Sequence, residues 1–247
     1  MSDEKSRVTQ TVILVVSLVL IVVAFGLSAA GLISPSWQVV DIREFRAEHH
    51  HGLWLDCTRP ERQIASARES VHDLPPLHCT YKFDSSASKE IDENIQNIDQ
   101  NSAAGESEHH EFFFWHKCVL VFSIGSLVFA AAALCGGLCA PCCASCAVIF
   151  TILVAVALIL GVVADAVFFF AAHRVDNRFV QGLVSTYQQE IGIAFYLHGC
   201  GTLLYLFAFI VSTIATYQLL RKSEGRSSLP LRELAPLYGS RVRETLA

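Results

Sequence analysis

The sequence has 247 residues, of which 53% are hydrophobic and 17% are charged, with a formal net charge of −5. Soluble domains carry about 25% charged residues, so this composition excludes an ordinary soluble domain. The small negative charge also gives no indication of nucleic-acid binding.

Four long apolar segments dominate the chain. Each reaches the roughly 20 residues that a helix needs to cross the hydrocarbon core of a bilayer. The segments cover residues 12–33, 118–138, 146–172 and 193–220. We therefore predict a membrane α-helical protein in which the four helices form a left-handed transmembrane bundle.

The first segment could instead be a cleaved signal peptide, because Lys5 and Arg7 precede it. Its apolar run is longer than the usual region of about 7–15 residues, and acidic Asp3 and Glu4 also precede it. We therefore expect the first helix to be retained.

Basic residues near helix ends indicate the cytoplasmic side of a membrane protein. Lys5 and Arg7 lie in the N-terminal segment, 1–11. The tail, 221–247, carries six basic residues: Arg221, Lys222, Arg226, Arg232, Arg241 and Arg243. An even number of spans places both ends on one side, so we predict two cytoplasmic termini, although Arg174 and Arg178 argue weakly against this topology. The outer loops are then 34–117 and 173–192, and residues 139–145 form a cytoplasmic turn.

The first outer loop favours a small antiparallel sheet. Pro35 disfavours helix at the residue before it. Residues 37–42, 53–57 and 77–83 have strand patterns, and residues 178–181 could add an edge strand. Isoleucines at helical spacing predict a thin amphipathic helix over 89–100, or a loop that folds on contact. Residues 112–115 form an aromatic belt at the membrane entry, and the tail after residue 220 is expected to be flexible.

Small residues four positions apart let helices in lipid approach closely. Three such pairs are expected to lie at helix contacts: Gly26 and Ala30, Ala132 and Gly136, and Ala157 and Gly161.

Asp165 is the single charged residue inside the third segment. A charge in hydrocarbon is costly, so its side chain should face the bundle interior and have a partner. A helix rises about 1.5 Å per residue, so counting from the outer ends of the third and fourth segments places His198 at a depth similar to that of Asp165. His198 is therefore the candidate partner. Thr202 and Tyr205 are competing donors, and a hydrated or protonated Asp165 is the alternative.

Histidines and cysteines gather in two places. The run His49, His50 and His51 lacks the spacing of a zinc site, and we interpret it as solvated loop histidines. Cysteines crowd the cytoplasmic turn, where we expect reversible acylation rather than metal binding, with unmodified thiols as the alternative. The acylation candidates are Cys139, Cys142, Cys143 and Cys146.

Neither a nucleotide-binding nor a hydrolase motif occurs in the sequence. We therefore predict no enzymatic activity, no cofactor and no metal.

The first outer loop carries a distinctive set of residues: Trp37, Gly52, Leu53, Trp54, Cys57 and Cys79. With four spans and cytoplasmic ends, this set resembles the claudin superfamily, which includes claudins, peripheral myelin proteins and the gamma subunits of channels and glutamate receptors. It looks closest to the divergent invertebrate Clc-like relatives. The interval between the two cysteines is longer than in typical claudins, and the tail lacks their terminal Tyr-Val.

The resemblance implies a disulfide between Cys57 and Cys79, which lie in predicted strands on the oxidising side. It also implies a plasma-membrane protein that acts in cell–cell contact or paracellular barrier formation, with self-association within and between membranes. The alternative is an auxiliary subunit that modulates a channel or receptor. Thr245 to Ala247 could make a weak contact with a PDZ domain.

Overall fold

The structure is a computed structural model of the chain. It describes residues 2–42, 47–59, 78–83, 112–141, 144–174, 178–181 and 186–244.

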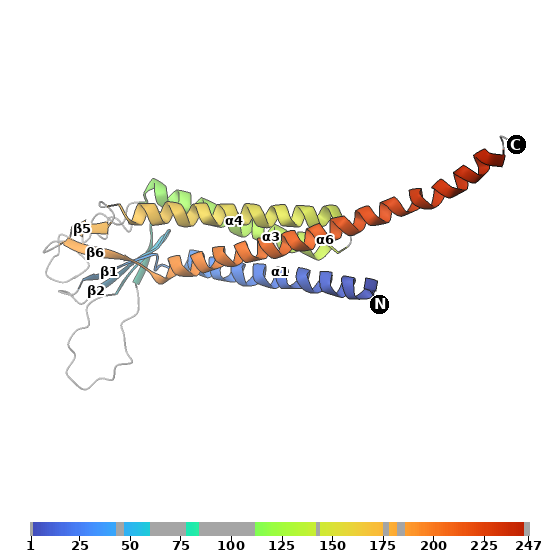
Figure 1. Cartoon of the computed structure of the whole chain (residues 1–247). Coiled ribbons are helices and arrows are strands. Elements are labelled where there is room, and N and C mark those ends of the chain that lie inside the picture. The colour runs from blue at the N-terminus through green and yellow to red at the C-terminus, as the bar shows by residue number, and fades with distance from the viewer. Residues whose placement is uncertain are drawn as a thin grey trace, which may run out of the picture.

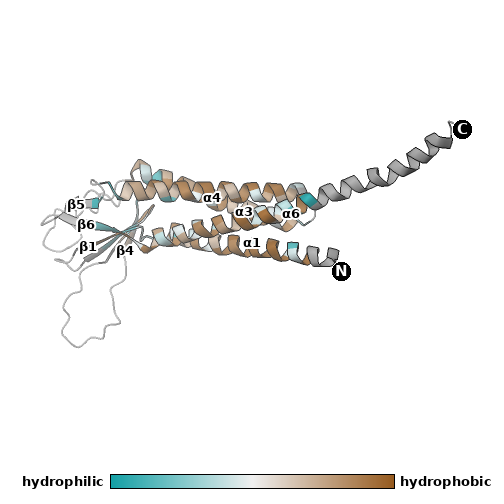
Figure 2. Ribbon diagram, viewed as in Figure 1, coloured by the Kyte–Doolittle hydropathy of each residue, from teal (hydrophilic) through white to brown (hydrophobic). Residues whose placement is uncertain are grey.

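Four helices run side by side, with a small sheet at one end and both termini toward the other (Figure 1). They are α1 (Ser2–Ile33), α3 (Phe114–Cys139), α4 (Ala144–Ala172) and α6 (Ile193–Glu244). Each contains a stretch long and apolar enough to cross a membrane, which confirms the four-helix prediction. Figure 2 shows that hydrophobic residues cover most of the bundle.

The helices pack most extensively in two pairs, α1 against α6 and α3 against α4. The expected contact pair on α1 is wrong, since Gly26 and Ala30 are exposed, and on α3 Ala132 is exposed while Gly136 faces Phe150 and Leu153 of α4. The pair on α4 lies at a contact as expected: Ala157 and Gly161 are buried, and a Cβ atom on Gly161 would meet Thr202 of α6. The close approach of α1 to α6 uses Gly31 and Gly201 instead. A Cβ atom on Gly31 would stand 2.8 Å from the Ala194 carbonyl oxygen. The spacing of small residues did not predict the contact of Gly31 and Gly201. Apolar sequences contain many small residues four positions apart, and only the packing of the helices determines which of them lie at a contact.

No helix was expected from the sequence after residue 220, whereas α6 continues through Pro230 and Pro236 to Glu244. A proline removes one backbone hydrogen bond and tends to bend a helix. Leucine, arginine and glutamate, which favour helix, surround both prolines. Figure 1 shows this part of α6 curving away from the bundle.

Six strands form the sheet, in the order β4-β3-β2-β1-β6-β5 with antiparallel neighbours. The strands are β1 (Gln38–Ile42), β2 (Ala47–His51), β3 (Leu55–Arg59), β4 (His78–Tyr81), β5 (Phe179–Gln181) and β6 (Thr186–Ile191). The sequence predicted β1, β3, β4 and β5 but not β2 or β6. The proposed helix at 89–100 lies outside the described residues.

Candidate functional site at the seat of the sheet

Two tryptophans join the sheet to the end of α1. The last carbonyl groups of a helix have no partner within the helix and must find one elsewhere. The indole Nε1 of Trp37 donates to the Gly31 carbonyl at 2.8 Å, and Nε1 of Trp54 donates to the Leu32 carbonyl at 3.0 Å. The two family-motif tryptophans therefore cap the C-terminus of α1, which explains why both sit just beyond it.

The Trp37 ring is buried among aromatic side chains of α4 and α6. Its centroid lies 4.8 Å from that of Phe168 and 6.3 Å from that of Phe195, both edge-on. Leu53 is fully buried in the same cluster. Edge-to-face pairs of this kind add about 0.5–1.5 kcal/mol beyond the area they bury. Trp37 and Leu53 thus pack the base of the sheet against the bundle. We call this junction, formed by Trp37, Gly52, Leu53 and Trp54, the seat of the sheet.

Gly52 has a steric role in this seat. A Cβ atom there would stand 2.6 Å from the Leu55 carbonyl oxygen and 2.9 Å from Cα of Pro35. Both neighbours are backbone atoms that cannot move aside cheaply. The glycine of the Gly-Leu-Trp run therefore lets the turn into β3 lie against the segment that leaves α1.

The same segment also contacts the start of α6. The amide of Ala194 donates to the Ser36 carbonyl at 3.0 Å, and the amide of Gly192 donates to the Trp37 carbonyl at 2.9 Å. Residues 34–37 thus connect the end of α1, the first strand and the first turn of α6.

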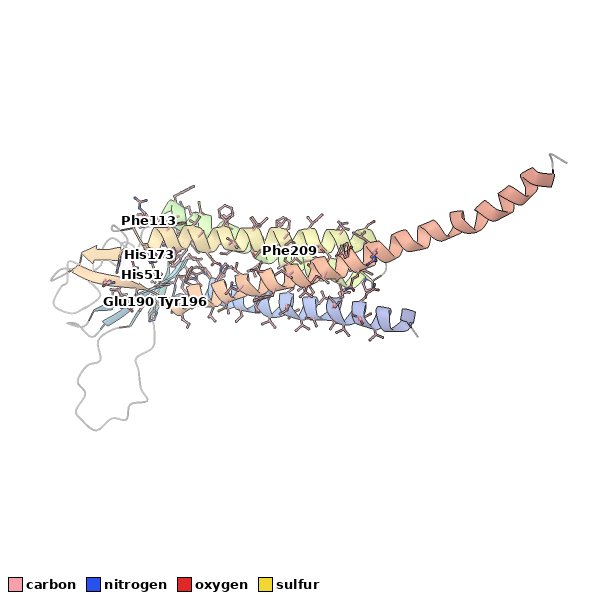
Figure 3. The ribbon with its side chains drawn as sticks, in the orientation of Figure 1. His51, Phe113, His173, Glu190, Tyr196 and Phe209 are labelled. Carbon is pink, nitrogen blue, oxygen red and sulfur yellow. A yellow bond between two sulfur atoms is a disulfide. The ribbon has the colours of Figure 1, made fainter. Side chains whose placement is uncertain are left out.

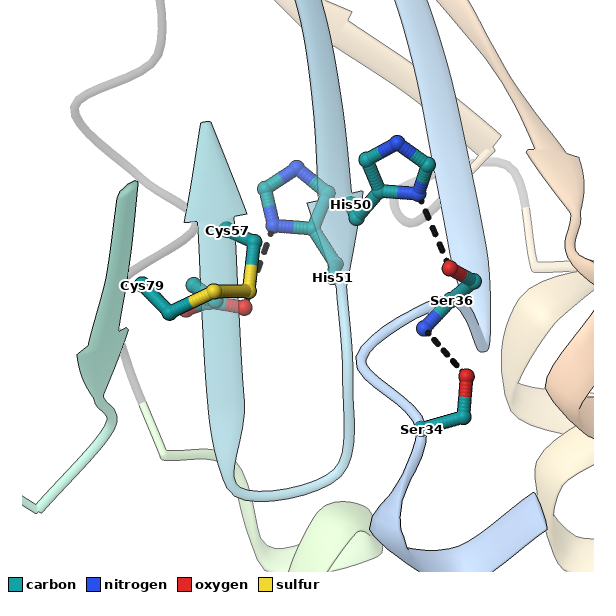
Figure 4. The surroundings of a disulfide bond; sticks show 7 residues. Ser34, Ser36, His50, His51, Cys57 and Cys79 are labelled. Carbon is teal, nitrogen blue, oxygen red and sulfur yellow. Dashed lines mark hydrogen bonds and ion pairs between the residues drawn. A yellow bond between two sulfur atoms is a disulfide. The ribbon is translucent and has the colours of Figure 1, made fainter. Parts of the chain in front are cut away.

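A disulfide joins β3 to β4, which confirms the pairing of Cys57 with Cys79. The two residues are direct partners in the strand register, and Cys57 is fully buried. Figure 4 shows the bond between the strands, with the Ser36 hydroxyl bonded to Nδ1 of His50 nearby, at 3.0 Å. A typical disulfide stabilises a fold by about 2–4 kcal/mol, mainly by restricting the unfolded chain.

A buried polar cluster lies on the other face of the sheet. Nζ of Lys82 lies 3.3 Å from Oδ1 of Asp56 and 3.1 Å from Nε2 of His116, the first-turn histidine of α3. Nδ1 of His51 also lies 3.3 Å from Oδ1 of Asp56. Because an ammonium group only donates, Nε2 of His116 is the acceptor. The cluster therefore connects β2, β3 and the end of β4 to α3.

Burial lowers the pKa of the Lys82 ammonium below its ordinary value of 10.5, and attraction from Asp56 offsets only part of that effect. A desolvated ammonium is costly unless it is paired. The chain therefore places a poorly hydrated positive charge where the sheet meets α3.

The interpretation of the His49 run as solvated loop histidines is wrong. The three residues belong to β2, and His49 and His51 are buried. The rings of His49 and His51 lie 6.3 Å apart on the same face of the strand. His51 can be buried here because Asp56 of β3, which is itself paired with Lys82, is its partner, and a sequence pattern does not reveal that contact.

Inside the bundle, Asp165 of α4 meets His198 of α6. Nδ1 of the fully buried His198 lies 2.6 Å from Oδ1 of Asp165, so the imidazole donates to the carboxylate. The His198 ring also lies 5.6 Å from the Trp37 ring. The two candidate residues are therefore brought together directly below the seat of the sheet.

At the opposite end, Cys139 is an exposed free thiol, whereas Cys146 is disulfide-bonded. Cys142 and Cys143 lie outside the described residues, as do Thr245 to Ala247. Because a disulfide-bonded sulfur cannot be acylated, the choice of Cys146 as an acylation candidate is wrong. Acylation of the other three cysteines and PDZ binding stay predictions, with Cys139 as the candidate that has a free thiol in the described part.

Sequence reasoning missed Lys82 and His116. His116 directly follows the aromatic belt at the start of a membrane span, and polar residues in such places need partners. The rule applied to Asp165 would have singled out His116 as well. Lys82 lies between Tyr81 and Phe83 at the end of a predicted strand, and a charged residue between two aromatic residues would have indicated the partner of His116.

Known proteins resemble the chain over most of its length. A sequence model of the Clc-like family matches residues 11–224. Clc-like protein 2 of Caenorhabditis elegans is 30% identical over 205 residues, which is 80% of this chain and 72% of the relative. Clc-like protein 5 of the same organism is 24% identical over 194 residues, 73% of this chain and 63% of that relative. The match to the family model, together with four membrane spans and a disulfide-bonded sheet, shows that the chain belongs to the claudin-like Clc-like family of multi-pass membrane proteins.

Proposed function

We propose that this protein acts at the plasma membrane in contact between cells, as a non-enzymatic subunit of a paracellular barrier. Both termini would be cytoplasmic and the sheet extracellular. The basic residues near both ends of the chain support this orientation, because such residues favour the cytoplasmic side of a membrane.

The observation that carries the proposal is the arrangement of the sheet edges. Strand β4 stands at one end of the strand order and β5 at the other. Edge strands present backbone groups that can pair with another chain. Because the two edges differ, contact between them is heterologous, and a heterologous contact that does not close into a ring produces an open row. A row of subunits along the membrane is the architecture that a seal between cells requires.

The test is to express the full chain in epithelial cells that lack their own claudins. We expect enrichment at borders where both neighbouring cells express it, and a raised electrical resistance across the cell sheet. Thr80→Lys places a charge on the edge strand β4 and should abolish the rows. Gln188→Lys is the matched control, since Gln188 is exposed on β6, which is paired on both sides.

Uniform surface distribution with unchanged resistance would reject the barrier proposal. The auxiliary-subunit alternative would then gain support from co-purification with one channel or receptor. Equal loss of rows in Thr80→Lys and Gln188→Lys would reject the edge mechanism.

A further inference from the structure

A connected series of aromatic rings crosses from the β3–β4 strand pair to the start of α3. The Tyr81 ring lies 5.7 Å from that of Trp54 and is stacked on Phe83 at 5.6 Å. The Phe83 ring in turn lies 6.2 Å from Phe112. Nζ of Lys117 stands 5.1 Å from the centre of the Phe112 ring. We call these five residues the aromatic patch.

The patch is open to its surroundings, since Tyr81 is 48% and Phe83 61% exposed. Contiguous exposed apolar surface of this kind is uncommon on a water-facing protein and marks a binding surface.

The lipid-facing side of α3 leads directly into the patch. Phe114, Val121, Ile124 and Val128 recur at helical spacing, so they share one face of α3, and all four are exposed. The exposed Lys117 falls on the same face. Because α3 is a membrane span, this face contacts lipid. The patch is therefore continuous with a surface that the bilayer already covers, at the level where the span begins. Figure 3 places Phe113, the residue before this span, at the sheet end of the bundle.

The chemistry of the patch matches that level of the membrane. Tyrosine and tryptophan prefer the headgroup region, where one end of the side chain is apolar and the other is hydrated. An exposed lysine there can bind a lipid phosphate. We propose that the aromatic patch binds the headgroup and glycerol region of phospholipids, so that the base of β4 rests on the membrane surface.

The strand end is built for such a position. Between Tyr81 and Phe83, Lys82 is buried against Asp56 and His116. Tyr81 and Phe83, on either side of Lys82, are both exposed. One side of this segment is thus fixed inside the protein by the polar cluster, while the other side presents two rings to lipid. Lipid would then help to set the tilt of the sheet.

The test uses the full chain, at one copy per phosphatidylcholine nanodisc, with para-trifluoromethylphenylalanine at a single position. Fluorine NMR would measure relaxation caused by a nitroxide on the lipid headgroup, and separately by a soluble gadolinium chelate. Position 83 tests the patch. Position 188, which is exposed on β6, is the water-facing control, and position 121 on α3 is the control within the bilayer.

We expect the headgroup nitroxide to relax the label at position 83 several-fold more than the label at 188, and the soluble chelate to relax it several-fold less. Equal behaviour at 83 and 188 would show that water covers the patch and overturn the proposal. Protection of position 83 from both agents would show that protein covers it, which overturns the proposal equally. Neither outcome depends on the barrier function.

Discussion

The close approach of α1 to α6 gives a sharp test, because two glycines two residues apart on α6 should respond oppositely to the same substitution. A Cβ atom on Gly201 would meet the Ser28 hydroxyl, the Ala24 carbonyl oxygen at 2.9 Å and the Ser28 amide nitrogen at 3.1 Å. Two of these three are backbone atoms of α1. A Cβ atom on Gly199 would meet nothing within 4 Å.

The magnitudes follow from two opposing effects. Alanine is more favourable than glycine inside a helix by at most about 0.5–1 kcal/mol. Adding a methyl group to a tightly packed contact costs about 1–3 kcal/mol. Gly201→Ala should therefore lower the free energy of unfolding by about 1–2 kcal/mol, as α1 is pushed away from α6. Gly199→Ala should leave the free energy of unfolding unchanged or raise it slightly.

The assay is unfolding in mixed micelles by titration with a denaturing detergent. Fluorescence of Trp37, Trp54 and Trp115 is a suitable signal, because all three lie near the base of the sheet. Equal stability of the two variants would refute the reasoning, since the α1–α6 contact would then not depend on Gly201.

Three further predictions concern the seat and the groups below it. Asp165→Asn and His198→Gln, alone and combined, should show a coupling on the order of 1 kcal/mol in a double-mutant cycle of detergent unfolding, and additive losses would exclude a direct interaction. Trp37→Phe should cost about 1–3 kcal/mol in the same assay, because the Gly31 carbonyl loses its donor in a buried place, whereas the half-buried Trp54→Phe should cost less. The pKa of Lys82 is lowered in the folded chain and is 10.5 in the unfolded chain. At pH values between the two, the unfolded chain binds this proton and the folded chain does not, so the contribution of Lys82 makes the free energy of unfolding rise with pH. Thermal unfolding at increasing alkaline pH should show that rise in the native chain and a smaller one in Lys82→Met, and identical slopes would contradict the prediction.

Features that depend on long continuous patterns could be predicted from the sequence. An apolar run of 20 or more residues has few alternatives to a membrane span, so the four spans were expected, although α1 begins earlier and α6 continues further than the apolar runs alone indicate. The partner of Asp165 could be named as a candidate because helical rise fixes depth in a bundle. The pairing of Cys57 with Cys79 followed from the family resemblance and from their positions in strands.

Features that depend on partners distant in the sequence could not be predicted. Strand β2 has polar residues in succession, and no alternating pattern distinguishes it from a loop. His51 is buried against Asp56 of β3, which in turn pairs with Lys82 just after β4, and neither contact is visible in the local sequence pattern. The same holds for Gly31 and Gly201, whose importance depends on which faces of two helices meet.

The seat also determines how a contact at the sheet could affect the membrane-spanning part. Gly31 is involved in two interactions at once: its carbonyl accepts from Trp37, and its Cα packs against the first turns of α6. Trp37 in turn lies against His198, which donates to Asp165 of α4. Packed interiors tolerate little continuous deformation. A force on the sheet that moved Trp37 would therefore have to disturb the ends of α1, α4 and α6 together, so the sheet and this end of the bundle should move as one body rather than as two hinged parts.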